Sequence, residues 1–147
     1  MGMFSNIAYT DAAKADLLAA ADRYAPREFA AMLGGRAVEN LVTGSTALVE
    51  NLLILPNTSI DNESFEIDGA LFFRYEHELR KCGQMFLGFA HSHPNGTTAP
   101  SHRDRLELWP NYVQVITNCY RCDAFVINTD RTVHLLPENQ RAEQPCS

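Results

Sequence analysis

Residues 85–104 read MFLGFAHSHPNGTTAPSHRD, and the rest of the chain is organised around them. The first six of these residues are apolar and rich in strand formers, so we expect a strand that continues into His91 and His93. Because residues i and i+2 of a strand share a face, both imidazoles would point to one side of the sheet. The Pro-Asn-Gly and Ala-Pro units that follow interrupt regular structure and turn the chain back.

A helix start follows this turn. Ser101 stands at the expected N-cap and Asp104 lies three residues on, which is the spacing of a capping box. Leu106 and Trp109 would share the apolar face of this helix, and Pro110 would stop it. Asp104 would then lie in the first helical turn, near the strand end that carries the histidines. Two imidazole nitrogens and one carboxylate oxygen form a three-ligand zinc set that leaves a fourth position for water, as in catalytic sites.

Each of these residues also has a simpler interpretation. A His-x-His pair at a strand end is more often a pair of surface residues or of hydrogen-bonded polar residues. Ser101 could act only as a helix cap, and Asp104 only as a partner of the helix dipole. Capping does not exclude metal binding, so the residues alone leave both interpretations open.

The composition sets the class of protein. With 147 residues, 46% of them hydrophobic, the chain is long enough for one domain with a true core. We place this domain at residues 1–136 and a polar, frayed C-terminal tail at 137–147. A net charge of −6 argues against nucleic acid as a partner, since no basic face is available to neutralise phosphates. No apolar run approaches the roughly 18 residues of a membrane span and the N-terminus lacks a signal-peptide pattern, so we expect no membrane partner and a cytoplasmic location.

The four cysteines do not predict a disulfide framework in that compartment. Cys119 and Cys122 form a CxxC unit, but no second CxxC accompanies it and it lies between two strand-like runs. We interpret the pair as reduced thiols in a hairpin rather than as a structural zinc site.

The rest of the chain alternates between helix and strand patterns. Helices are expected at residues 11–24, started by Thr10 or Asp11, and at residues 69–81, capped by Asp68 and ended by Gly83. Further strands are expected at residues 29–35, 46–55, 64–68, 112–117, 124–128 and 132–136. This order predicts an α/β fold with a single-domain mixed β-sheet flanked by helices, and a small helix at the metal residues.

Two features of the strand at residues 29–35 bear on its ends. Gly34 and Gly35 are expected to close the strand, with a turn behind them. Glu28 stands at its entrance, where an acidic residue is normally a solvated end residue.

Three segments resemble one known family. The run His91-Ser92-His93, seven residues from Pro94 to Pro100, and then Ser101-x-x-Asp104 are similar to the His-x-His-x(7)-Ser-x-x-Asp signature of the JAMM zinc metalloproteases, also called MPN+ or JAB1/MPN/Mov34. Residues 24–35, with Pro-x-Glu before an apolar run and glycine, resemble the first-strand motif of that family. Residues 65–68 resemble its Phe-x-Ile/Val-Asp segment. The resemblance implies the compact prokaryotic type and a cytidine-deaminase-like MPN/JAMM architecture.

The resemblance also implies a role for each residue of the motif. The zinc ligands fall on His91, His93 and Asp104, the general acid/base on Glu28, and the hydroxyl that stabilises the transition state on Ser101. The implied cofactor is Zn²⁺, which lowers the pKa of a bound water to about 7. Glu28 would accept the proton of that water and pass it to the leaving amine.

The implied function is that of a zinc-dependent isopeptidase or peptidase. Its partner would be a ubiquitin-like, β-grasp or sulfur-carrier-like modifier, cleaved after its C-terminal tail in deconjugation or precursor processing. Such a tail could add as a strand to an exposed sheet edge near the metal. Only seven residues separate Asp104 from Tyr112, which leaves no room there for the large second insertion of eukaryotic deubiquitinases.

Two other functions remain open at this point. One is a zinc amidohydrolase of the same fold that acts on a small amide or a cell-wall peptide. The other is a non-catalytic MPN-type assembly module. The exposed edge strands of a small mixed sheet would also suit a homodimer.

Overall fold

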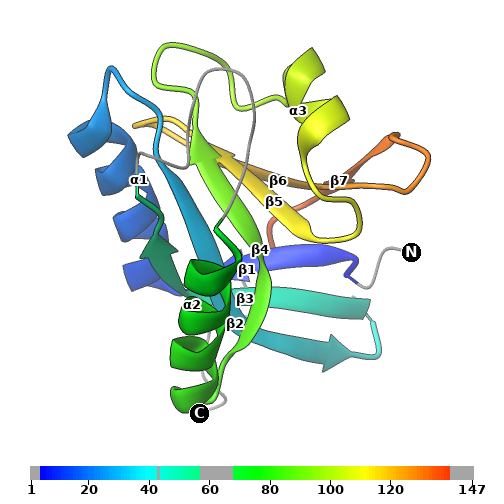
Figure 1. Ribbon diagram of the computed structural model, residues 1–147. Coiled ribbons are helices and arrows are strands. Elements are labelled where there is room, and N and C mark those ends of the chain that lie inside the picture. Colours follow the sequence, from blue (N-terminus) through cyan, green and yellow to red (C-terminus); the bar gives the residue numbers. More distant parts are fainter. Residues whose placement is uncertain (1–3, 43, 57–67, 140–147) are drawn as a thin grey trace.

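One mixed β-sheet forms the body of the protein (Figure 1). The structure, a computed structural model, describes residues 4–42, 44–56 and 68–139. Within these ranges seven strands run in the order β1-β3-β2-β4-β5-β6-β7; β1 is parallel to β3 and β4 to β5, and the other neighbours are antiparallel. The elements are β1 (Asn6–Tyr9), α1 (Asp11–Tyr24), β2 (Ala30–Asn40), β3 (Gly44–Ile54), α2 (Gly69–Lys81), β4 (Met85–Ser92), α3 (His102–Glu107), β5 (Val113–Thr117), β6 (Cys122–Ile127) and β7 (Val133–Leu136). The predicted mixed sheet flanked by helices is confirmed.

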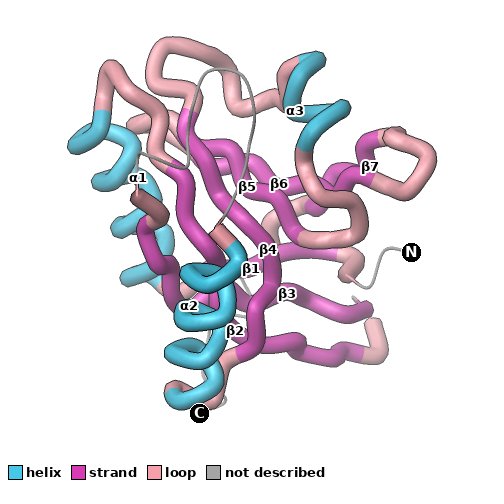
Figure 2. Tube along the Cα trace, in the orientation of Figure 1, coloured by secondary structure: helices cyan, strands magenta, loops and turns pink. Residues whose placement is uncertain are grey.

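The two long helices cover opposite faces of the sheet. Strand β2 shows this by its alternation: Ala31 and Leu33 pack in one core cluster with residues of α1, whereas Ala30 and Met32 pack in another with Leu71 of α2. In Figure 2 the strands form one curved layer with α2 in front of it. The sheet therefore has an α1 face and an α2 face.

Both long helices begin and end where the sequence predicts. The side chain of Thr10 accepts a hydrogen bond from the N–H of Ala13 at 3.1 Å, and that of Asp68 accepts one from Ala70 at 3.0 Å. Each is an N-cap. Gly83 follows α2 with φ of 73°, a backbone conformation that glycine adopts without strain. None of the described helices is both long and apolar enough to cross a membrane.

The prediction that Gly34 and Gly35 close a strand is wrong. Strand β2 continues through both to Asn40, and the pairing register shifts at this point against both neighbouring strands. A Cβ atom on Gly35 would lie 1.9 Å from the carbonyl oxygen of Leu48 on β3. The glycines therefore mark a β-bulge with a close backbone approach, not a turn.

The chain ends of the described part pair with each other. Strand β1, which the sequence analysis missed, has only four residues and begins with the polar Asn6. The N–H of Ile7 donates to Pro137 at 3.0 Å, and the N–H of Asn139 donates to Ile7 at 2.7 Å. The prediction of fraying from Pro137 is therefore wrong for residues 137–139. The rest of that tail, and residues 64–67 of an expected strand, lie outside the described residues.

Helix α3 differs from the prediction in its apolar face. It ends at Glu107 and has no buried side chain, and Leu106 is 57% exposed. The apolar contacts come just after the helix, where Leu108 is buried and Trp109 packs against Phe89 of β4. The helix is therefore held by its cap and by the segment that follows it.

Candidate metal centre

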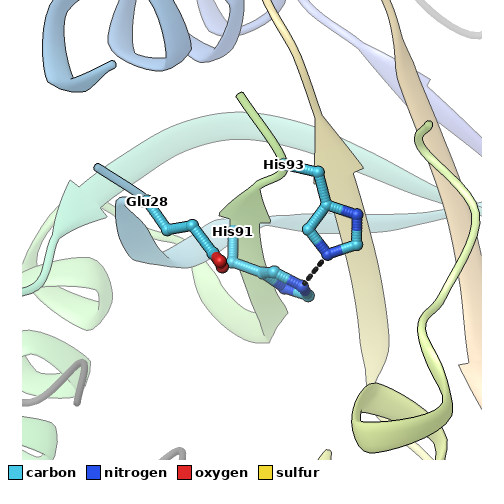
Figure 3. Close-up of side chains that lie close together, drawn as sticks. All are labelled: Glu28, His91 and His93. Atoms are coloured by element: carbon cyan, nitrogen blue, oxygen red, sulfur yellow. Dashed lines mark hydrogen bonds between the residues drawn. The ribbon is translucent and has the colours of Figure 1, made fainter. Parts of the chain in front are cut away.

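Strand β4 brings two imidazoles to one point. His91 pairs with Ala30 of β2 in the sheet register, and because cross-strand partners share a face, its side chain lies on the α2 face. His93 comes two residues after His91, directly after the end of β4. The Nε2 atoms of the two histidines lie 3.2 Å apart, as the dashed line in Figure 3 marks. His91 is 6% exposed and His93 is half-buried.

Asp104 completes a triangle with the two histidines. Its Oδ1 lies 3.2 Å from the Nε2 of His91, and its Oδ2 lies 3.2 Å from the Nε2 of His93. A tetrahedral zinc with ligand distances of about 2.0–2.1 Å has edges of roughly 3.3 Å. The three side chains therefore have the donor types and the spacing that suit one zinc ion.

The cap of α3 orients this carboxylate. Ser101 Oγ accepts a hydrogen bond from the N–H of Asp104 at 3.0 Å, and the N–H of Ser101 donates to Asp104 Oδ2 at 2.9 Å. This is the predicted capping box. The capping role and the contact with both histidines occur together, because the reach back to the N-cap turns the carboxylate toward the end of β4.

Glu28 approaches the same point from the segment just before β2. Continuing the antiparallel pairing of Ala30 with His91 by two residues places Glu28 opposite His93. Its carboxylate and one nitrogen from each histidine all lie within 4.8 Å of one another, so these residues could also hold a metal ion. Figure 3 shows the carboxylate turned toward the ring of His91. Glu28 is an exposed residue.

The two histidines differ in what holds their second ring nitrogen. His93 Nδ1 lies 2.9 Å from the carbonyl oxygen of Thr97, so Nδ1 is the donor of that bond and Nε2 is the ring nitrogen directed at Asp104. His91 Nδ1 is buried and has no hydrogen-bond partner among the described residues. The orientation of His93 therefore depends on the loop that contains Thr97, and that of His91 depends on strand β4.

This loop, residues 94–101, is braced by the β5–β6 hairpin. Asn118 Nδ2 donates to the carbonyl of Gly96 at 3.2 Å, and the buried hydroxyl of Thr98 donates to Asp123. Sequence reasoning missed these contacts, because nothing in the local pattern links the loop to a hairpin some 20 residues further on. The CxxC unit lies in the same hairpin, with both thiols free.

His93 and Asp104 shift the pKa values of each other's side chains. The hydrogen bond with Asp104 raises the pKa of His93 above its ordinary value, and burial opposes this change. Burial acts to raise the pKa of Asp104, but hydrogen bonds from His91, His93 and the backbone of Ser101 outweigh it and lower that pKa well below its usual range. Asp104 is thus an anion at any pH near neutrality, as a metal ligand must be.

Comparison with protein-family models identifies one family. The family model of prokaryotic homologs of the JAB domain matches residues 10–132. The solution structure of a protein from Desulfitobacterium hafniense is similar, with 27% identity, a TM-score of 0.74, and coverage of 91% of this chain and 92% of that one. No curated protein matches the chain by sequence.

Two more distant structures share the fold. A JAB1/MPN domain protein from Archaeoglobus fulgidus has 19% identity and a TM-score of 0.50, over 92% of this chain and 99% of that one. A protein from Salinibacter ruber has 18% identity and a TM-score of 0.62, over 95% of each chain.

Proposed function

Because the chain belongs to the prokaryotic homologs of the JAB domain, within the JAMM/MPN family, we propose that it is a zinc-dependent isopeptidase or peptidase. The observation that carries the proposal is the convergence of His91, His93 and Asp104 at 3.2 Å, with the carboxylate of Glu28 beside the imidazoles. An assembly module has no need of this convergence, because scaffolding requires neither imidazoles at one point nor a free carboxylate next to them.

In this proposal His91, His93 and Asp104 hold the ion. A bound zinc ion supplies a Lewis acid and a hydroxide nucleophile at neutral pH. The carbonyl of Thr97 keeps the tautomer of His93 that presents Nε2, and the backbone N–H of Ser101 keeps the carboxylate of Asp104 in place.

In this proposal Glu28 transfers the proton, and Ser101 stabilises the oxyanion. Glu28 accepts a proton at its carboxylate and delivers it to the leaving amine nitrogen. Ser101 uses a lone pair for its cap bond to Asp104, so its hydroxyl proton remains free to donate to the oxyanion that forms from the scissile carbonyl.

We propose as substrate the C-terminal tail of a ubiquitin-like or sulfur-carrier-like modifier joined to an amine, in the cytoplasm. The pairing of β4 bears on how such a tail would bind. β4 is paired on both sides, with β2 and β5, so the described residues offer no free strand edge beside the histidines. We propose that the tail lies across the end of β4.

The test is hydrolysis of a β-grasp modifier fused through its C-terminal glycine to a short peptide. We expect cleavage by the zinc-loaded protein, and loss of about 10²-fold or more in Glu28→Gln with zinc content unchanged. Glu78→Gln is the control, since Glu78 is an exposed helix residue whose nearest cation lies 3.8 Å away. Cleavage that survives both Glu28→Gln and chelation would overturn the mechanism.

The same hydrolysis assay, extended to small amides and cell-wall peptides, distinguishes the proposed function from the two other functions. Cleavage of small amides or cell-wall peptides, with modifier fusions left intact, would replace the modifier with a small substrate. A chain that takes up no zinc and cleaves nothing would be an assembly module instead.

A further inference from the structure

We propose that Ser92, the residue between the two histidines, is a positioning residue that fixes Glu28 beside them. The inference rests on the proposed function only in the use made of Glu28 as proton carrier. Ser92 is fully buried. Because neighbouring residues of a strand alternate between faces, its side chain lies on the side of the sheet opposite to the imidazoles, so it does not point at the metal ligands.

Ser92 makes two hydrogen bonds to the residue next to Glu28. The N–H of Phe29 donates to Ser92 Oγ at 2.9 Å, and the N–H of Ser92 donates to the carbonyl of Phe29 at 3.1 Å. In a regular antiparallel pair both bonds would join backbone atoms. Here a side-chain hydroxyl accepts one of them, at the point where β2 has not yet begun.

This arrangement restricts where Glu28 points. The N–H of Phe29 belongs to the same planar peptide unit as the carbonyl of Glu28. A fixed peptide plane restricts the direction in which the Glu28 side chain leaves the backbone. The ring of Phe29 is buried and packs on Tyr24, with ring centroids 6.0 Å apart. This packing anchors Phe29, the residue that follows the peptide unit. Glu28 itself is exposed and precedes β2, so the strand ladder does not hold it.

The serine thus links the two halves of the site. Its backbone is part of the strand that carries His91 and His93, and its hydroxyl holds the peptide that carries Glu28. A purely structural role would be the satisfaction of one buried N–H group. The two roles differ in one consequence, because only a positioning role moves the Glu28 carboxylate away from the histidines when the hydroxyl is removed.

The experiment compares Ser92→Ala with Ser92→Thr by NMR on the metal-free protein. We expect nuclear Overhauser contacts between the Glu28 side chain and the His91 ring in the unsubstituted protein and in Ser92→Thr, and their loss in Ser92→Ala together with faster exchange of the Phe29 amide. Thr46→Ala is the control, because it removes another buried hydroxyl, bonded to Asn6 at the far end of the sheet. Contacts retained in Ser92→Ala would overturn the inference.

A second variant, Ser92→Cys, tests the inference if Ser92→Ala does not fold. Ser92→Cys keeps a weaker acceptor in the same place. Weakened contacts between Glu28 and His91 in that variant support the inference, and unchanged contacts overturn it.

The kinetics of cleavage of the modifier fusion test the positioning role independently of the NMR contacts. We expect kcat to fall about 10²-fold in Ser92→Ala, with KM and zinc content unchanged, and to recover in Ser92→Thr. If the unsubstituted protein cleaves nothing while the contacts behave as expected, the proposed function fails and the positioning role stands. If the unsubstituted protein is active and Ser92→Ala is equally active, the positioning role fails and the function stands.

Discussion

Replacing Ser101 by alanine would separate the two uses of one hydroxyl. Its oxygen accepts the N–H of Asp104 at 3.0 Å, and loss of an N-cap typically costs about 1 kcal/mol. For a chain of 147 residues this corresponds to a fall in Tm of about 4 °C. Since α3 has six residues and buries no side chain, much of the loss would be local fraying of α3, so about 4 °C is an upper limit.

Zinc affinity should change little in the same variant. The N–H of Ser101 that holds Asp104 Oδ2 at 2.9 Å belongs to the backbone, and alanine keeps it. Activity should change much more, because loss of one oxyanion donor costs about 3 kcal/mol, or roughly 10²-fold in kcat. The expected pattern is therefore a small loss of stability, an unchanged zinc affinity and a large loss of kcat.

Thermal melts, zinc titration and kcat on the modifier fusion measure the three effects, with Ser101→Thr as a control that keeps the cap and the hydroxyl. A kcat within about threefold of the unsubstituted value would refute the donor role of Ser101. A loss of zinc affinity as large as that of Asp104→Ala would show instead that the Ser101 side chain, not its backbone, orients the carboxylate.

Three further outcomes are expected. In zinc-free protein Asp104→Asn should lower the free energy of unfolding in urea most between about pH 4 and 6.5. The low folded-state pKa of Asp104 gives stability that is lost as the pH falls below that window, and the raised pKa of His93 gives stability that is lost as the pH rises above it. Cys82, which is exposed, should react with a maleimide faster than Cys122, because burial raises the pKa of the Cys122 thiol; mass spectrometry of peptides would show equal rates if this is wrong. Gly35→Ala should destabilise the protein by about 3 kcal/mol in urea unfolding, since its Cβ would lie 1.9 Å from a β3 carbonyl oxygen, and an unchanged midpoint would contradict the bulge.

Local rules were enough for half of the candidate site. The i, i+2 spacing on a strand predicts that His91 and His93 share a face, and the Ser-x-x-Asp unit predicts the capping box that turns Asp104 toward them. These features depend on neighbours within a few residues, so one sequence is sufficient to find them.

Glu28 shows where local rules fail. On its own it is an acidic residue before a strand, and only the pairing of Ala30 with His91, 61 positions away, brings it to the histidines. The resemblance to a family supplied this residue, and the sequence pattern did not. The contacts that brace the loop, between Asn118 and Gly96 and between Thr98 and Asp123, are non-local in the same way.

Glycine gave a misleading local signal. Gly34 and Gly35 are typical turn residues, but here their missing side chains allow two strands to approach at a bulge. The close approach is a property of the paired strand, which the glycines themselves do not indicate. Strand β1 was missed for a related reason, because its pairing with β3 and with residues 137–139 stabilises a segment too short to be recognised alone.

The most direct measurement is zinc binding by calorimetry, on the unsubstituted protein and on His93→Ala, with His77→Ala as a control on an exposed helix residue. Imidazole nitrogens and a carboxylate at 3.2 Å from one another predict one zinc per chain, lost in His93→Ala and kept in His77→Ala. Equal binding by both variants, or no binding by the unsubstituted protein, would contradict the metal centre.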